Sequence, residues 1–386
     1  MKFFHLIWGN LKRKKLRTLL TMLSVVVAFV LFGFLSSIKQ ALTGGVQMAG
    51  ADRLVVRHKI SIIQLLPVSY KARMERIPGV VLATHQTWFG GIYQDPKNFF
   101  MQCPVVPEEF FAIHPEITLP PEQMKAWLKT RTGAVVGRKT AERFHWKIGD
   151  RIPIQSAIYT RAGGNRTWEF DLVGVYDSKE KSADTTPMFF RYDYFDEACA
   201  TEFGKGSVGW YTIRVKDPAR AAETAKLVDQ EFENSDAETK TEPEGAFVQA
   251  WVSQIGNIEL IVAAILGAVF FTILLVTGNT MSQAVRERTG ELGVLKAIGF
   301  TNSQVVSLIL VESCLLSVLG GGFGLGLAWL LISRGDPTGG MLPLFFFPVR
   351  DLAIGAGLCL ALGLATGIFP ALQALRLRVA DALRRM

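Results

Sequence analysis

The chain has few of the residues that build metal and redox sites. Its 386 residues include 4 cysteines and 5 histidines. No two cysteines form a CxxC pair and no two histidines lie one helical turn apart, so we expect no metal site. Cys103 and Cys199 lie in a polar segment where either a disulfide or two separate buried thiols is possible. Cys314 and Cys359 lie in apolar segments, and we interpret them as small packing residues.

The sequence also lacks the phosphate-binding loop of an ATPase. That loop needs Gly, four residues and then Gly-Lys-Ser/Thr. In the nearest stretch, "GAVVGRKT" at residues 133–140, the second glycine comes one place early, and Arg138 separates it from Lys139. We interpret the stretch as a strand that runs into a helix. We therefore expect a subunit that is not an enzyme and carries no cofactor.

Charge is nearly absent from four long stretches. Each carries at most one charged residue, and they span residues 18–38, 258–281, 305–332 and 352–375. A helix needs about 20 apolar residues to cross a bilayer. The sequence therefore predicts a membrane protein with four transmembrane helices, the third of which begins at residue 302.

The first apolar stretch follows a basic start, so a cleaved signal peptide is an alternative to a membrane anchor. The stretch is too long for a signal peptide, and no clear small-x-small cleavage site follows it, so we expect an anchor. Before it, Phe4, Ile7, Trp8 and Leu11 have helical spacing beside a lysine cluster. Residues 1–17 are predicted to form an amphipathic helix at the membrane surface; an unstructured basic segment is the alternative.

The positive charge lies on one side of this topology. The two ends and the segment between the second and third helices hold 13 basic and 3 acidic residues, whereas residues 39–257 hold 27 of each. Positive charge in short loops marks the cytoplasmic side. We expect both termini, with the tail at 376–386, to be cytoplasmic, and residues 39–257 and the loop at 333–351 to lie outside. The net charge of +8 therefore reflects topology, and we expect no binding of nucleic acid.

Residues 39–257 have the mixed pattern of an α+β domain. Six segments that begin at residues 52, 79, 99, 150, 167 and 209 resemble strands, and three that begin at residues 120, 137 and 218 resemble helices. We predict two subdomains, the second inserted at about residues 115–205.

A charged segment, "QAVRERTGELGVLKAIGFTNSQV" at residues 283–305, separates the second and third apolar stretches. Gly299 has the place of a helix C-terminal glycine. Thr301 and Gln304 fit a capping box, with Phe300 and Val305 at the two positions of a hydrophobic staple. We predict a short capped helix and turn at residues 282–301, suited to insertion into the groove of a partner protein; a solvated connector is the alternative.

Charged and small residues in the third apolar stretch mark helix contacts. Glu312 lies about 10 Å along the predicted helix. Because a charge in lipid is usually paired or functional, we expect it to bond backbone or a polar partner at a helix contact and not to touch a substrate. Five glycines allow helices to approach closely, within a subunit or in a dimer, and a flexible hinge is the alternative: Gly320, Gly321, Gly322, Gly324 and Gly326.

The charged segment resembles the signature loop of the MacB/FtsX-type permeases of ABC transporters, which reads approximately "ERxxEIGxxKAxGA". "NLKRKKLRTLLTMLSVVVAF" resembles the entry to the family's first helix, "LVESCLLSVLGGGFGLGLAW" its third helix and "FPALQALRLRVADALR" its C-terminal segment. "AVVGRKTAERFHWKIGDRIPI" and "FDLVGVYD" resemble the family's periplasmic subdomain, more weakly.

This resemblance implies a permease dimer in the bacterial cytoplasmic (inner) membrane, in which each permease pairs with a separate cytoplasmic ATPase that holds ATP and magnesium. The ATPase would grip the helix around the residues Arg286, Glu287, Arg288, Gly290, Glu291, Leu292, Gly293, Leu295, Lys296, Ile298 and Gly299. We expect Leu292, Leu295 and Ile298 to supply the buried contact, and the charged side chains to orient the helix against the ATPase or lipid headgroups.

Two functions are compatible with the resemblance. In the first, ATP hydrolysis moves the outer domain for export or envelope trafficking of an amphipathic, peptide, lipid or lipoprotein substrate, with a periplasmic adaptor (membrane-fusion) protein as a possible partner. In the second, the outer domain switches a cell-wall enzyme or sensor and nothing is transported. The size of the outer domain favours transport. Neighbouring genes for an adaptor or for a peptidoglycan hydrolase would discriminate between the two.

Overall fold

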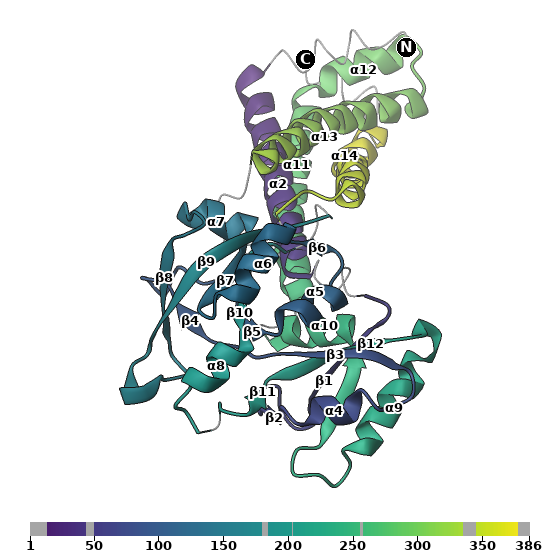
Figure 1. Cartoon of the computed structure of the whole chain (residues 1–386). Helices are drawn as coiled ribbons and strands as arrows, with labels where there is room; N and C mark the ends of the chain where they lie inside the picture. The colour runs from purple at the N-terminus through teal and green to yellow at the C-terminus, as the bar shows by residue number, and fades with distance from the viewer. Residues whose placement is uncertain are drawn as a thin grey trace. The chain divides into compact units, whose positions relative to one another are not determined.

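The structure is a computed structural model that describes residues 14–43, 50–179, 184–202, 204–254, 258–334 and 345–376. Two compact units share the chain (Figure 1). The helical unit comprises residues 1–40, 257–335 and 345–386, and the α+β unit comprises residues 41–256 and 336–344. Most of the amphipathic helix predicted at residues 1–17, of the loop at 333–351 and of the tail at 376–386 lies outside the described residues.

The described part of the helical unit is built from α2 (Lys15–Thr43), α11 (Ile258–Glu287), α12 (Thr289–Ala297), α13 (Asn302–Ser333) and α14 (Val349–Leu375). All but α12 are long and apolar enough to cross a membrane. Each predicted transmembrane segment lies within one of these four helices. The helix α11 continues past the predicted end at residue 281, because neither glycine nor proline interrupts the chain between Gly278 and Gly290.

Aromatic and small side chains pack the long helices together. Phe29 of α2 meets Phe270 of α11 edge-on, with 5.3 Å between ring centroids. The helices α13 and α14 run side by side (Figure 1), and Ser317 donates a 2.7 Å hydrogen bond to the carbonyl oxygen of Cys359. Cys314 and Cys359 lie at this contact opposite glycines of the facing helix, as expected for small packing residues.

The α+β unit contains a four-stranded antiparallel sheet in the order β13-β1-β12-β3. Its strands are β1 (Arg53–His58), β3 (Val80–Gln86), β12 (Trp210–Val215) and β13 (Thr239–Pro243). A 3₁₀ turn at Pro218–Arg220 leads into α9 (Ala221–Glu231), which packs on β13 and β1, and α4 (Tyr70–Met74) packs on β3. The helix α10 (Glu244–Gln254) follows β13, and β2 (Leu66–Pro67) pairs with β11 (Ser207–Val208).

The second sheet of this unit has seven strands in the order β4-β8-β9-β7-β10-β5, with β6 paired to β9. The strands are β4 (Gly91–Ile92), β5 (Gln102–Val105), β6 (Ile117–Thr118), β7 (Gly133–Gly137), β8 (Arg151–Ser156), β9 (Thr167–Ser178) and β10 (Met188–Arg191). The helices are α5 (Pro107–Ile113), α6 (Pro121–Lys129), α7 (Arg138–Phe144) and α8 (Tyr192–Ala198), with a 3₁₀ turn at Ala162–Gly164. Phe89, Trp168, Phe190 and Phe195 pack together in its core.

The seven-stranded sheet lies between β3 and β12 in the chain, which makes it an insert. It begins at Gly91, earlier than the boundary predicted near residue 115, because β4 pairs with β8 and, further along, β5 pairs with β10 as a parallel strand. Sequence alone did not show to which sheet this early strand belongs. The insert is therefore larger than expected, and its first two strands precede α5.

Two local interpretations of the α+β unit are settled by the structure. The stretch "GAVVGRKT" is β7 followed by α7, a strand that runs into a helix as predicted. A side-chain carbon on Gly137, at their junction, would lie 2.0 Å from the carbonyl oxygen of Thr185, so only glycine fits there. Cys103 and Cys199 are both buried and free, which leaves the second alternative, two separate thiols.

Candidate functional site

The helix α12 is a separate short helix between α11 and α13. It ends at Ala297, and Gly299 follows with a φ of +106°, a conformation that glycine adopts without strain. The side-chain oxygen of Thr301 accepts from the backbone N–H of Gln304 at 3.3 Å, and the Gln304 side chain accepts from the N–H of Thr301 at 2.9 Å. The predicted turn and capping box are confirmed. They fix the angle at which the chain enters α13.

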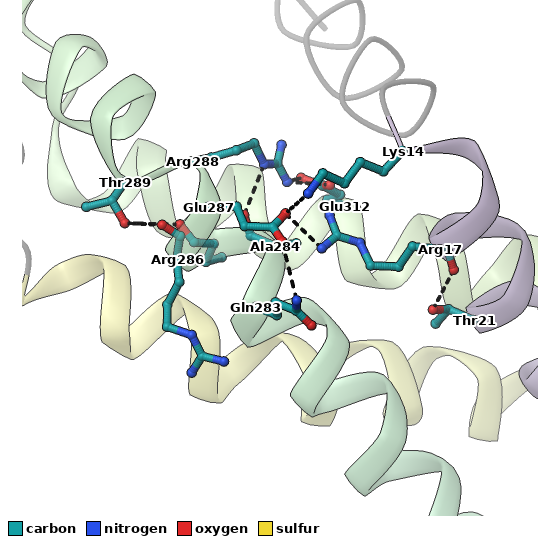
Figure 2. Close-up of polar contacts among 11 residues, drawn as sticks. Lys14, Arg17, Thr21, Gln283, Ala284, Arg286, Glu287, Arg288, Thr289 and Glu312 are labelled. Carbon is teal, nitrogen blue, oxygen red and sulfur yellow. Dashed lines mark hydrogen bonds and ion pairs between the residues drawn. The ribbon is translucent and has the colours of Figure 1, made fainter. Parts of the chain in front are cut away.

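Glu312 has a charged partner at a helix contact, as predicted. It lies in α13 with 6% of its surface exposed, and Arg288, the residue before α12, donates to both of its carboxylate oxygens at 2.7 and 2.9 Å (Figure 2). The Arg288 side chain is 17% exposed. A buried ion pair depends on both members, because removal of one leaves a charge without compensation. Arg288 therefore fastens the start of α12 to α13 and is directed inward, whereas the sequence suggested a contact with the ATPase or headgroups.

Glu287 fastens the end of α11 to α2. One of its carboxylate oxygens accepts from Lys14 at 2.7 Å and from Arg17 at 2.9 Å (Figure 2). Its other oxygen accepts from Gln283 at 3.4 Å. The guanidinium group of Arg286 extends away from these ion pairs in Figure 2. The adjacent residues Arg286, Glu287 and Arg288 thus point in different directions.

Lys296 also contacts the permease itself, whereas the sequence suggested a contact with the ATPase or headgroups. Its ammonium group donates to the carbonyl oxygens of Ala374 at 2.9 Å and Leu375 at 3.4 Å. These carbonyls belong to the last turn of α14, where backbone acceptors have no partner within the helix and a cation is favourable. The end of α12 is therefore fastened to α14.

The apolar residues of α12 do not form one exposed stripe. Leu292 packs in a cluster with Val285, Val305 and Ile309, Gly293 is buried and Leu295 is half-buried. Ile298, in contrast, is 73% exposed. The predicted set is therefore split between the inside of the unit and its surface.

The exposed residues of α12 and its C-cap have the spacing i, i+3, i+6 and i+7. We call them the outward face of α12: Glu291, Val294, Ala297 and Ile298. Val294 was missed in the sequence, although its spacing from Ile298 is that of one helix face. The partner of this face can thus contact two branched apolar side chains. Gly290 is half-buried beside it, and Gly299 is exposed after it.

A polar cavity of about 220 Å³ lies between α2, α11, α12 and α13. Its lining includes three basic and three acidic residues, so it attracts neither sign of ion strongly: Lys14, Arg17, Arg288, Glu287, Glu291 and Glu312. Threonines of α2 and α11 complete the polar wall. The residues of the ion pairs that join these helices therefore line the cavity.

The five glycines of α13 face in three directions. A side-chain carbon on Gly324 would lie 2.7 Å from the carbonyl oxygen of Val26 in α2, and Gly320 meets the same helix. Gly321 faces Cys359 of α14. Gly322 and Gly326 face open space. The helix is continuous through all five, so none of them breaks it, and three of them serve close packing in the described residues: Gly320, Gly321 and Gly324.

Four membrane-length helices, a charged helix between the second and third of them, and a large α+β unit between the first and second define a multi-pass membrane protein of permease type. A MacB-like periplasmic core domain model matches residues 18–231, and an FtsX-like permease C-terminal model matches residues 263–379. The chain belongs to the MacB/FtsX family of ABC transporter permeases. Membership of this family implies an ATPase partner.

Relatives of the chain differ in how much of their length it covers. An uncharacterized ABC transporter permease of Methanocaldococcus jannaschii is 23% identical over 402 residues, which are 97% of this chain and 96% of that protein. A pyoverdine export ATP-binding/permease protein of Pseudomonas fluorescens (strain Pf0-1) is 30% identical over 262 residues, 65% of this chain but 37% of that protein. The periplasmic region of MacB from Actinobacillus actinomycetemcomitans aligns with 54% of this chain at 11% identity and a TM-score of 0.37.

Proposed function

We propose that this permease transmits the work of a separate ATPase to the α+β unit, and that the ATPase binds the outward face of α12. The observation that carries the proposal is the two-sided character of this helix. One side is fastened to three membrane helices, through Arg288 to α13, through the adjoining Glu287 to α2 and through Lys296 to α14. The other side presents Val294 and Ile298 to solvent.

This arrangement suits a rigid lever. A partner that pushes or pulls the outward face displaces α12, and the three contacts pass that displacement to the helices that hold them. ATP and magnesium would be bound by the partner. The Methanocaldococcus relative, which this chain covers almost completely, is described as a permease, and this supports a separate ATPase subunit.

We propose that this movement serves export or envelope trafficking of an amphipathic, peptide, lipid or lipoprotein substrate. The names of two groups of relatives, pyoverdine export and macrolide export proteins, support export. The size of the α+β unit also supports export, because its four-stranded and seven-stranded sheets offer a large surface to a substrate or an adaptor protein. A homodimer of permeases, each with its own ATPase, completes the proposed assembly.

The orientation that the proposal requires places α12 and both termini in the cytoplasm. The excess of basic residues at the ends and around α12 supports this orientation. A thiol introduced at Lys240 should react with an impermeant reagent in cells whose cytoplasmic membrane is intact, and one introduced at Glu291 should not. Reaction of the thiol at position 291 under the same conditions would show that the permease has the opposite orientation.

Ile298→Asp tests the proposed ATPase contact. Burial of an aliphatic side chain of this size contributes about 1.5–3 kcal/mol, and an unpaired carboxylate buried in its place costs several kcal/mol more. We expect the variant to lose its ATPase on co-purification in detergent, while the permease inserts and folds. Ile298 is a better test position than Leu295, because Leu295 is half-buried within the permease.

Val349→Asp is the matched control. Val349 is 82% exposed and begins α14, at the opposite end of that helix from the contact with Lys296. The control should retain the ATPase. If Ile298→Asp retains it as well, α12 is only a connector and the proposed function is wrong.

A further inference from the structure

A buried arginine lies where the chain enters the α+β unit. Arg53 begins β1, and its side chain is 6% exposed. Its Nε donates to Glu244 at 2.6 Å, and its Nη1 lies 2.9 Å from a carboxylate oxygen of Glu116. The same nitrogen reaches the carbonyl oxygen of Ile113 at 3.3 Å. One guanidinium group therefore holds two carboxylates, in the forked geometry for which arginine is suited.

The three charged residues come from three parts of the chain. Arg53 follows the segment that leads from α2, and Glu244 begins α10, which leads towards α11. Glu244 also accepts from the backbone N–H of Gly50 at 3.0 Å, at the same entry point. Glu116 belongs to the insert, between α5 and β6. The cluster thus joins the entry from the membrane, the exit to the membrane and the inserted sheet.

Hydrogen bonds fix Glu116 of this cluster in an ionised state within the insert. Burial by itself would raise the pKa of the Glu116 carboxyl, but hydrogen bonds from His114 and Arg53 lower that pKa to about 2. His114 lies 3.3 Å from Glu116 and is itself buried. The Glu116 backbone oxygen accepts from the N–H of Lys179 at 3.0 Å, at the end of β9. Glu116 is therefore ionised at ordinary pH and anchored in the insert.

We propose that Arg53 is a positioning residue for coupling: it locks the entry, the exit and the insert together, so that a displacement of α2 against α11 turns the α+β unit as one body. This inference rests on the proposed function, because it takes the membrane helices as the source of movement. Without the cluster, the insert is joined to the four-stranded sheet chiefly by apolar packing and by the contacts of α5 with β3. These contacts have no fixed hydrogen-bond geometry, so the insert can then move relative to the sheet.

A second ion pair in the same sheet provides a matched control. Arg57 and Glu242 also join β1 to β13, at 2.9 Å, with side chains 13% and 12% exposed. This pair has similar chemistry and burial, but both of its members belong to the four-stranded sheet. Loss of this pair should weaken the sheet without releasing the insert.

The test measures three distances in the full permease bound to its ATPase in lipid nanodiscs, with and without ATP. Spin-labelled amino acids are placed in pairs at Asn279 of α11, Lys226 of α9 and Ala162 of the insert, all exposed. In the unmodified protein, ATP should shift both distances from Asn279 and leave the Lys226–Ala162 distance unchanged. In Glu116→Ala, ATP should still shift Asn279–Lys226, but the Lys226–Ala162 distance should now change as well. Glu242→Ala should behave as the unmodified protein does.

The outcomes separate the two claims. If Glu116→Ala keeps the Lys226–Ala162 distance fixed, the positioning role of the cluster is refuted while the proposed function stands. If ATP shifts no distance from Asn279 in the unmodified protein, the proposed function fails and takes the inference with it. Should Glu116→Ala not fold, Glu116→Gln and Arg53→Lys keep the side-chain volume and weaken the fork, and the same readout applies to both.

Discussion

Arg288→Met should destabilise the helical unit by about 3–5 kcal/mol, the usual consequence of removing one member of a buried ion pair. The variant leaves Glu312 charged, 6% exposed and without the only side-chain donor recorded for it in the described residues. The measurement is thermal and denaturant unfolding of the purified permease in detergent. The same variant should also weaken coupling, because it frees the start of α12 from α13.

Two controls accompany this prediction. Adding Glu312→Gln to Arg288→Met should recover most of the lost stability, since the uncompensated charge is then gone. Lys14→Met removes a cation from an ion pair whose lysine side chain is 55% exposed, so its effect on unfolding should be small. An Arg288→Met variant as stable as Lys14→Met would show that the pair with Glu312 contributes little.

Gly324→Leu should separate α2 from α13 and give a permease that melts far below the unmodified protein or fails to accumulate. A side-chain carbon there would lie 2.7 Å from a backbone oxygen and 2.9 Å from the Cβ of Phe29, and backbone cannot rotate out of the way. Overpacking of a well-packed site typically costs about 1–3 kcal/mol, which is a large fraction of the total stability of a folded protein. Melting of the purified protein in detergent measures the effect.

Gly326→Leu is the control on the same helix, because nothing lies within 4 Å of a side-chain carbon at that position. Its melting temperature should match that of the unmodified protein. Equal losses in the two variants would mean that the glycines act through backbone flexibility, the hinge alternative, and not through close packing. A Gly326 variant that melts normally but no longer self-associates would place Gly326 at the dimer contact.

Local chemistry made the ends of the helices predictable. Gly299, Thr301 and Gln304 act through contacts within a few residues of one another, so their roles follow from spacing. The capping pair marked the start of α13 to the residue. The cost of an isolated charge in lipid likewise predicted that Glu312 has a polar partner.

Which side of α12 packs inward depended on contacts that its own sequence does not contain. Helical periodicity groups residues into faces but does not say which face meets the rest of the protein. Leu292 is covered by residues of α11, α13 and α14, and Ile298 is not. The contact of Lys296 could not be predicted from the sequence around it, because its acceptor lies at the end of α14, 78 residues further along the chain.

The α+β unit shows the same limit. The apolar alternation of β9 and β12 predicted strands, whereas β13, with the sequence "TKTEP", has no apolar face and pairs with β1 through backbone bonds. The cluster around Arg53 joins residues 63 and 191 positions apart. No local pattern marks such a site, because its members meet only when both sheets have formed.

The most direct test of the account is photo-crosslinking from α12 in membranes that contain the permease and its ATPase. A photoreactive amino acid is placed at Val294 on the outward face or, as the control, at Leu292 among the membrane helices. We expect the probe at Val294 to crosslink to the ATPase and the probe at Leu292 to crosslink only within the permease. A probe at Val294 that never captures the ATPase, in a complex that hydrolyses ATP, would contradict the central claim that the ATPase drives this protein through α12.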